Sequence, residues 1–218
     1  ADAVTVLTAH VENPAGYGRI IRDGDQVARI VEHKDCSDDE RAVDEINSGI
    51  YVFDAGTLRD GLASLTAENV QGELYLTDVI AFARSRGERV GAFECDDVWQ
   101  TEGVNDRAQL ATLNAEANRR IVTRWMTEGV TIADPAGTWI EAGVDLATDV
   151  TLLPGVRLQG ATSIAAGALV GPDSTLRSVE VGVGATVSYT CAELAVVAEG
   201  AEVGPFARLR PGERTDLG

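Results

Sequence analysis

The sequence of 218 residues predicts an α/β domain, then a long connecting helix, then a parallel β-helix. Three observations carry this prediction: mixed strand and helix patterns in the first half, a helical apolar stripe in the middle, and a six-residue apolar repeat in the second half. The repeat is the most specific, because an α-helix has a period of about 3.6 residues and a strand a period of about 2. Hexapeptide repeats are typical of a parallel β-helix.

The six-residue repeat runs through most of the second half, with two interruptions. Its members are Ile140, Leu146, Leu152, Leu158, Ile164, Val170 and Leu176, then Val181 and Val187, then Val197, Val203 and Leu209. Glycine or aspartate often stands three positions earlier, as at Gly143, Asp149, Gly155, Gly167 and Asp173. Each hexad is therefore predicted to be a short strand with its apolar residue inside, after a tight corner that accommodates positive φ. A β-sandwich fits less well, because its turns recur at scattered intervals of about 8–12 residues.

The first half reads as alternating strands and helices. Strands are expected at residues 4–9, 18–22, 27–31, 49–53 and 89–94, with a short run at Val98, and helices at residues 38–43, 55–65 and 76–86. Asp23-Gly24-Asp25 predicts a hairpin turn. Thr77-Asp78 predicts the N-cap of the third helix. These elements define a first domain over residues 1–106.

The connecting helix is expected from Asn105 to Glu128. Its apolar stripe, at spacings of three and four, is Leu110, Leu113, Ala117, Ile121, Val122 and Trp125. Asp106 stands at its start and Gly129 at its end. The predicted domain boundaries are therefore residues 107–129 for the linker helix and residues 130–218 for the N-terminal coils of the β-helix.

Composition narrows the function. The formal net charge of −17 argues against nucleic acid and anionic membranes as partners. No run of about 20 apolar residues predicts a membrane span. The three cysteines, Cys36, Cys95 and Cys191, have no metal-binding spacing and suggest a reducing, cytoplasmic compartment. The chain starts directly in an apolar run and ends just after a repeat, so we expect an internal piece of a longer protein, truncated at both ends.

Four polar clusters in the first half are candidate ligand contacts. They are residues 13–19, 31–35, 45–51 and 71–78. Glycines in the first permit close approach of a ligand to the backbone. Acidic Glu32 follows a strand, where α/β sheets bind ligands, and Asn47 offers both a donor and an acceptor. Taken singly, each cluster has an alternative: a plain loop, a solvated strand end, or a cap or turn.

Together, six motifs resemble one known family over essentially the whole chain. They are Gly-Tyr-Gly-Arg-Ile at 16–20, Val-Glu-His-Lys-Asp at 31–35, Glu-Ile-Asn-Ser-Gly-Ile at 45–50, Gln-Gly-Glu-Leu-Tyr-Leu-Thr-Asp at 71–78, Gly-Val-Asn-Asp-Arg at 103–107, and Val-Gly-Pro-Phe-Ala-Arg-Leu-Arg-Pro-Gly at 203–212. The resemblance is to the bacterial bifunctional N-acetylglucosamine-1-phosphate uridyltransferases/glucosamine-1-phosphate N-acetyltransferases. It implies a partial Rossmann-like nucleotidyltransferase domain and a left-handed β-helix.

The resemblance also implies roles for individual residues. Gly18, Glu32 and Asn47 would hold the N-acetylglucosamine moiety of UDP-N-acetylglucosamine, with Tyr75 and Thr77 against the same site. Asn105 would contact Mg²⁺ and the nucleotide sugar. Arg210 would grip the sugar phosphate of the acetyltransferase site, a task that suits a bidentate guanidinium.

The implied activity belongs to the biosynthesis of UDP-N-acetylglucosamine for the cell wall. Acetyl-CoA and UTP would be co-substrates, glucosamine-1-phosphate and N-acetylglucosamine-1-phosphate the sugar substrates, Mg²⁺ the cofactor, and a homotrimer the assembly. The family's glycine-rich UTP loop and aspartate metal ligand are not in this sequence, nor are the acetyltransferase residues after the Arg-Pro-Gly segment. His10 and His33 both lie in the first half. We therefore expect the chain alone to have neither activity.

Two other functions remain open. One is a different sugar-1-phosphate nucleotidyltransferase with a hexapeptide tail, against which Glu-His-Lys at 32–34 and Arg-Leu-Arg-Pro-Gly at 208–212 argue. The other is a non-catalytic assembly subunit. A glycine-rich loop with Arg and Lys encoded roughly 100 residues upstream would favour an enzyme over the assembly subunit.

Overall fold

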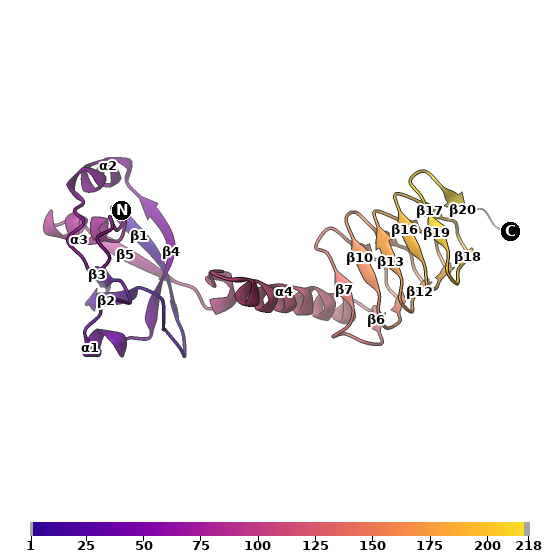
Figure 1. Ribbon diagram of the computed structural model, residues 1–218. Coiled ribbons are helices and arrows are strands. Elements are labelled where there is room, and N and C mark those ends of the chain that lie inside the picture. The colour runs from indigo at the N-terminus through magenta and orange to yellow at the C-terminus, as the bar shows by residue number, and fades with distance from the viewer. Residues whose placement is uncertain (1, 216–218) are drawn as a thin grey trace. The chain divides into compact units, whose positions relative to one another are not determined.

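The computed structural model describes residues 2–215, which form two compact units divided between Asn105 and Asp106 (Figure 1). An α/β unit, a helix and a parallel solenoid follow one another along the chain, in the order that the sequence predicts. None of the helices in residues 2–215 is long and apolar enough to cross a membrane.

The first unit is built on one five-stranded sheet, in the order β3-β2-β4-β1-β5. Its strands are β1 (Val4–His10), β2 (Arg19–Asp23), β3 (Gln26–Val31), β4 (Glu45–Phe53) and β5 (Val90–Glu94). β1 and β5 are parallel, and the other pairs are antiparallel. The hairpin predicted at Asp23-Gly24-Asp25 joins β2 to β3, with φ of +62° at Gly24.

Helices accompany this sheet: α1 (Asp38–Arg41), α2 (Ala55–Ser64) and α3 (Asp78–Ser85). Helix α3 packs against β3 and β5, and α2 packs against α3. Val4, Val6, Ile20, Val27, Ile30, Ile80, Ala83 and Val90 form the buried cluster of this unit. Side-chain caps define the starts of two of these helices. Ser37 and Glu40 form a capping box at the start of α1, and the Asp54 carboxylate accepts from the Gly56 and Thr57 backbone N–H groups at the start of α2.

Three expectations for the first unit need correction. Val98 lies in a 3₁₀ turn, η1 (Val98–Gln100), and not in a strand. β4 begins at Glu45, four residues before the expected start, because a bulge opposite Val6 and Thr8 lets pairing continue past Gly49, whose φ is +80°. Thr77 stands at the N-cap of α3, but its side chain makes no cap hydrogen bond.

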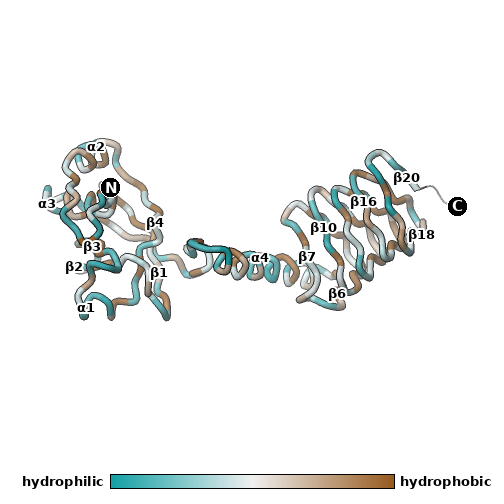
Figure 2. The backbone as a smooth tube through the Cα atoms, in the orientation of Figure 1, coloured by the Kyte–Doolittle hydropathy of each residue, from teal (hydrophilic) through white to brown (hydrophobic). Residues whose placement is uncertain are grey.

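The second unit is a helix, α4 (Arg107–Thr127), followed by a five-coil parallel solenoid that is consistent with a left-handed β-helix. Three sheets form its walls, in the orders β18-β15-β12-β9-β6, β19-β16-β13-β10-β7 and β20-β17-β14-β11-β8. The strands are β6 (Thr131–Ile132), β7 (Trp139–Ile140), β8 (Asp145–Leu146), β9 (Thr151–Leu152), β10 (Arg157–Gln159), β11 (Ser163–Ile164), β12 (Leu169–Val170), β13 (Thr175–Arg177), β14 (Glu180–Val181), β15 (Thr186–Val187), β16 (Cys191–Glu193), β17 (Val196–Val197), β18 (Glu202–Val203), β19 (Arg208–Leu209) and β20 (Arg214–Thr215). Figure 2 shows apolar positions recurring from coil to coil.

The repeat residues do fill the interior of the solenoid. Leu152, Leu158 and Leu176 are fully buried, and the other repeat residues are buried or partly buried. Ala192 occupies the inward position in the second interruption of the repeat, where no large apolar side chain reveals it. The repeat shortens to five residues at three corners, and each contains one non-glycine residue with positive φ: Ser178, Tyr189 and Leu194. Four of the five predicted corner residues also have positive φ; Gly143 does not.

Helix α4 is shorter than the predicted 105–128 by two residues at its start and one at its end, but its flanking residues are as predicted: Asp106 accepts from the Gln109 backbone N–H, and Gly129 has a φ of +96°. Its predicted stripe is only partly right. The buried residues are Asn118, Val122 and Trp125, whereas Leu110 is 46% exposed, because only the C-terminal half of α4 covers the first coil. The Asn118 amide donates to Thr138 O at 2.8 Å and accepts from Ile140 N at 3.0 Å. A helix side chain thus satisfies the edge strand β7.

Candidate sugar-nucleotide site

Gly18, Glu32 and Asn47 come together from three neighbouring strands of the first unit. Gly18 precedes β2, Glu32 directly follows β3, and Asn47 lies in β4. The backbone N–H of Asn47 donates to Gly18 O at 2.9 Å. A Cβ placed on Gly18 would lie 3.5 Å from Asn47 Cβ and 3.6 Å from Glu32 Oε2. The missing side chain therefore leaves a gap the size of one carbon atom beside Ile30 Cγ2, at 3.2 Å, and between the side chains of Asn47 and Glu32.

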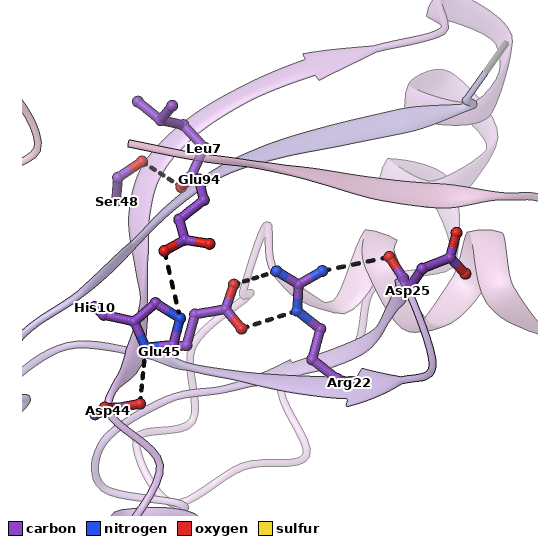
Figure 3. Close-up of polar contacts among 8 residues, drawn as sticks. All are labelled: Leu7, His10, Arg22, Asp25, Asp44, Glu45, Ser48 and Glu94. Atoms are coloured by element: carbon purple, nitrogen blue, oxygen red, sulfur yellow. Dashed lines mark hydrogen bonds and ion pairs between the residues drawn. The ribbon is translucent and has the colours of Figure 1, made fainter. Parts of the chain in front are cut away.

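The bulge in β4 orients Asn47. The Asn47 Oδ1 accepts from Gly49 N at 3.1 Å, and the Ser48 hydroxyl donates to Leu7 O at 2.7 Å (Figure 3). Burial raises the pKa of the nearby Tyr51 phenol; a hydrogen bond with Asn47 lowers that pKa and the charge of Glu32 raises it. Tyr51 thus belongs to the surroundings of Asn47 and is affected by the charge of Glu32. The sequence analysis included Tyr51 in its third cluster but gave it no role.

Thr77 holds Glu32 from the other side. Its Oγ1 donates to Glu32 Oε1 at 3.1 Å, and Thr77 is only 5% exposed. The hydroxyl that was expected to cap α3 is therefore used on the carboxylate. One Glu32 oxygen is fixed by Thr77, while the other, Oε2, lies toward Gly18.

Tyr75 contacts a different carboxylate, that of Asp35, and shares a cavity with Glu32. Its hydroxyl donates to Asp35 Oδ2 at 3.3 Å and accepts from Gln71 Nε2 at 2.8 Å. The same cavity, of about 310 Å³, is lined by Glu32, Asp35, Tyr75 and Asp78 among others. Burial, with a smaller contribution from the charge of Asp35, raises the pKa of Asp78.

Asn105 is the last residue of the first unit and is exposed. The segment before Asn105 is tied to the loop before Gly18, because the Tyr17 hydroxyl donates to Glu102 Oε2 at 2.8 Å. Burial first, and then this bond to Glu102, raise the pKa of Tyr17.

Arg210 belongs to the second unit and is exposed directly after β19. Its backbone N–H donates to Glu213 Oε2 at 2.8 Å. The structure thus groups Gly18, Glu32, Asn47, Thr77 and Tyr75, and it leaves Arg210 in a different unit.

The described residues do not make a complete metal site. Residues 2–215 contain no group of three or more His, Cys, Asp or Glu side chains that could hold an ion. Asn105 offers a single amide oxygen, whereas Mg²⁺ is octahedral and usually takes one or two carboxylates together with water and substrate phosphates.

An ion-pair cluster stands two residues along β4 from Asn47 (Figure 3). Arg22 Nε donates to Glu45 Oε2 at 2.8 Å, and the second guanidinium nitrogen bonds Glu45 Oε1. His10 Nδ1 lies 2.9 Å from Asp44 Oδ1, and His10 Nε2 lies 3.8 Å from Glu94 Oε1. The hydrogen bond to Asp44 raises the pKa of His10.

Comparison with known proteins finds relatives over nearly the whole chain. The family model for nucleotidyl transferases matches residues 1–110. Proteins named "Bifunctional protein GlmU" match nearly the whole chain. The one from Cutibacterium acnes is 62% identical over 220 residues, covering 98% of this chain and 52% of its own length. The one from Kineococcus radiotolerans is 59% identical over 213 residues, covering 98% and 43%.

The chain spans about half the length of the curated relatives it matches. The matched family model covers about half of the chain and includes the whole sheet that brings Gly18, Glu32 and Asn47 together. The chain therefore belongs to the nucleotidyl transferase family.

Proposed function

We propose that this chain is part of a bifunctional enzyme of UDP-N-acetylglucosamine biosynthesis. One reaction would transfer UMP from UTP to N-acetylglucosamine-1-phosphate, and the other would acetylate glucosamine-1-phosphate from acetyl-CoA. Support comes from the similarity to proteins named bifunctional GlmU over nearly the whole chain, and from an α/β unit followed by a hexapeptide solenoid.

The observation that carries the uridylyl-transfer proposal is the space at Gly18 between Asn47 and Glu32. An amide can donate to a carbonyl and accept from a hydroxyl, and a carboxylate accepts from hydroxyl groups. The acetamido group and ring hydroxyls of N-acetylglucosamine offer these partners. Because Gly18 has no side chain, its backbone can approach the sugar closely.

In this reaction a phosphate oxygen of the bound sugar attacks the α-phosphate of UTP, the bond to the β-phosphate breaks, and pyrophosphate leaves. Catalysis of such transfers is mostly positioning and charge stabilisation. Glu32, fixed by Thr77, and Asn47, fixed by Gly49, would hold the sugar so that its phosphate meets the nucleotide. Mg²⁺ bound to the phosphates would neutralise developing charge, with Asn105 as one ligand.

The acetyl-transfer proposal places Arg210 on the phosphate of glucosamine-1-phosphate. A guanidinium can bind phosphate through two parallel hydrogen bonds. The solenoid suits assembly into a trimer with these sites between subunits. The three cysteines are free in the structure, which suits a cytoplasmic enzyme.

Assays of the complete enzyme with separate substrates test this proposal. We expect UTP with N-acetylglucosamine-1-phosphate to give UDP-N-acetylglucosamine, and acetyl-CoA with glucosamine-1-phosphate to give the acetylated sugar. Residues 1–218 alone should catalyse neither reaction. Preference for ATP or GTP over UTP would instead support a different sugar nucleotidyltransferase, and inactivity with all of them would support an assembly subunit.

A further inference from the structure

Arg19 is a buried cation without a carboxylate partner. It lies in β2, paired in register with Val31 and Ile46, and is 2% exposed. No carboxylate of residues 2–215 forms an ion pair with it, and its Nε is buried without a hydrogen-bond partner. Burying a charge this way is unfavourable for folding. Stability alone therefore gives no reason for an arginine here.

The two terminal nitrogens of Arg19 reach the two loops that carry the sugar site. Nη1 donates to Tyr17 O, and Nη2 lies 3.4 Å from His33 Nδ1. Because arginine can only donate, His33 Nδ1 is the acceptor in this hydrogen bond. Tyr17 directly precedes Gly18, and His33 directly follows Glu32. One guanidinium thus joins the neighbours of two site residues.

Other contacts also hold the loop that enters at Gly18, because the Tyr17 hydroxyl donates to Glu102 and Tyr17 N–H donates to Pro14 O. Among residues 2–215, however, only Arg19 links this loop to the loop that carries Glu32. The loop that enters at Gly18 contains Gly16, with φ of +91°, and Gly18, and glycine backbones have many accessible conformations. Its position also affects Asn47, because Asn47 N–H donates to Gly18 O. A shift of this loop would therefore change the spacing of all three site residues at once.

We propose that Arg19 is a positioning residue that sets the separation of Gly18 and Glu32 by clamping Tyr17 and His33. Its effect on sugar binding rests on the proposed function, whereas its effect on the loops does not. Arg22, on the same strand, is the contrasting case: it makes a two-bond ion pair with Glu45, whose side chain is 7% exposed.

The test compares Arg19→Met with Arg22→Met in the complete enzyme. Arg19→Met removes an unpaired buried cation, so the thermal midpoint should stay the same or rise; Arg22→Met leaves Glu45 buried without its partner, so the midpoint should fall. Hydrogen exchange in peptides covering residues 16–20 and 45–49 should accelerate about tenfold in Arg19→Met alone. The KM for N-acetylglucosamine-1-phosphate should rise about tenfold with kcat within about twofold, as for a loss of ground-state binding.

Variants of His33 provide a second test of the clamp if Arg19→Met does not fold, because His33 lies in a partly exposed loop. His33→Ala removes the acceptor and should accelerate exchange in residues 16–20 and raise KM. His33→Asn places Oδ1 near the former Nδ1 and should restore both. Arg19→Lys, whose three N–H donors lie on one nitrogen and so reach only one of the two partners, should fall between wild type and Arg19→Met.

The proposal is overturned if exchange in these peptides is unchanged in Arg19→Met and His33→Ala. It is also overturned if Arg19→Met lowers the midpoint as Arg22→Met does and accelerates exchange throughout the first unit, because Arg19 would then be structural. If the wild-type enzyme lacks uridylyl transfer, the proposed function fails, while local acceleration of exchange still supports the clamp.

Discussion

At the scale of the residue, the candidate site depends on one atom that is missing. The Cβ that Gly18 lacks would lie 3.2 Å from Ile30 Cγ2, 3.5 Å from Asn47 Cβ and 3.6 Å from Glu32 Oε2. The φ of Gly18 is not in the left-handed region, so an alanine could adopt the same backbone. A methyl group here changes the space in the site and leaves the fold unstrained apart from a small shift of Ile30.

Gly18→Ala therefore offers a clean test of the space. We expect a change in unfolding free energy of no more than about 1–2 kcal/mol, because one tight contact must relax. Binding of N-acetylglucosamine-1-phosphate to the complete enzyme should weaken at least tenfold, roughly 1.4 kcal/mol. Calorimetric titration and urea unfolding measure the two effects. Unchanged affinity would show that the sugar does not occupy this space.

His10 gives the first unit a predictable pH dependence. Its pKa is raised above 6.5, chiefly by the hydrogen bond to Asp44, with smaller contributions from Glu94 and Glu45. The protonated form is thus favoured by folding, so its stabilisation is complete below the unfolded pKa and is lost as pH rises through the folded pKa. Because His10 is half exposed, the effect should stay below about 1 kcal/mol.

Urea unfolding of wild type and His10→Gln between about pH 5 and pH 9 measures this contribution. The wild type should be the more stable protein at the acidic end, and the difference should shrink toward the alkaline end. Asp44→Asn should remove most of it. A difference that grows with rising pH would contradict the sign.

The sequence identified Gly18, Glu32 and Asn47 through motifs that can be recognised from the order of residues alone, without knowledge of packing. The sequence analysis included Arg19 and Tyr51 in candidate clusters but gave neither of them a role of its own. An arginine in a strand usually reads as exposed, and pairing of β2 with both β3 and β4 buries Arg19. Long-range pairing of this kind is not encoded in any local pattern.

At the scale of the element, the solenoid strands are specified by very few residues each. Most contribute two residues to a ladder, with one side chain inward, so each coil depends on three inward positions. Leu158 is one of them and is fully buried. In a stack of this kind a coil is stabilised mainly by its neighbours.

Leu158→Asp should therefore unfold the solenoid. The aspartate would be buried without a partner, a cost that exceeds what two neighbouring coils restore. Circular dichroism and limited proteolysis should show loss of the second unit. Thr151→Asp, at a partly exposed position of β9, the strand that precedes β10 along the chain, is the matched control and should leave the unit folded. A folded Leu158→Asp protein would contradict an inward Leu158.

Periodicity predicted elements better than it predicted their partners. The six-residue repeat located the strands, but the stripe on α4 overestimated its contact with the solenoid, and the buried residue that completes the edge is the polar Asn118. Thr77 was assigned to a helix cap because the pattern of Thr-Asp at a helix start is local, while its partner Glu32 is 45 residues away.

At the scale of the whole molecule, two activities are proposed for one chain with two units. If each unit serves one reaction, damage to a site in one should leave the other reaction intact. Fold class followed from the residues themselves. The proposed activities did not, because the predicted strands and helices do not indicate which nucleotide is bound. The activities were inferred from the resemblance of the six motifs to a known family.

Asn47→Ala in the complete enzyme tests this separation. Uridylyl transfer should lose about 1–3 kcal/mol of transition-state or substrate binding, the cost of leaving polar groups unpaired. Acetyl transfer should stay within about twofold of wild type. Asn105→Ala should likewise impair only uridylyl transfer. An equal loss of both activities in Asn47→Ala would indicate a folding defect.

The complete enzyme should also be a trimer. Light scattering at several protein concentrations measures its mass directly. A trimeric mass that persists on dilution is the expected result, since the proposed acetyltransferase sites lie between subunits. A stable monomer at high concentration would contradict the assembly.

The short corners at Ser178, Tyr189 and Leu194 bear on how such a chain can change length during evolution. Each removes a single residue from the repeat while the strands on both sides keep their inward residues. A deletion within a strand would instead turn every following side chain of that strand to the opposite face. Insertions and deletions of one residue are therefore tolerated at the corners, and related genes should differ in length there, while their strands stay in step.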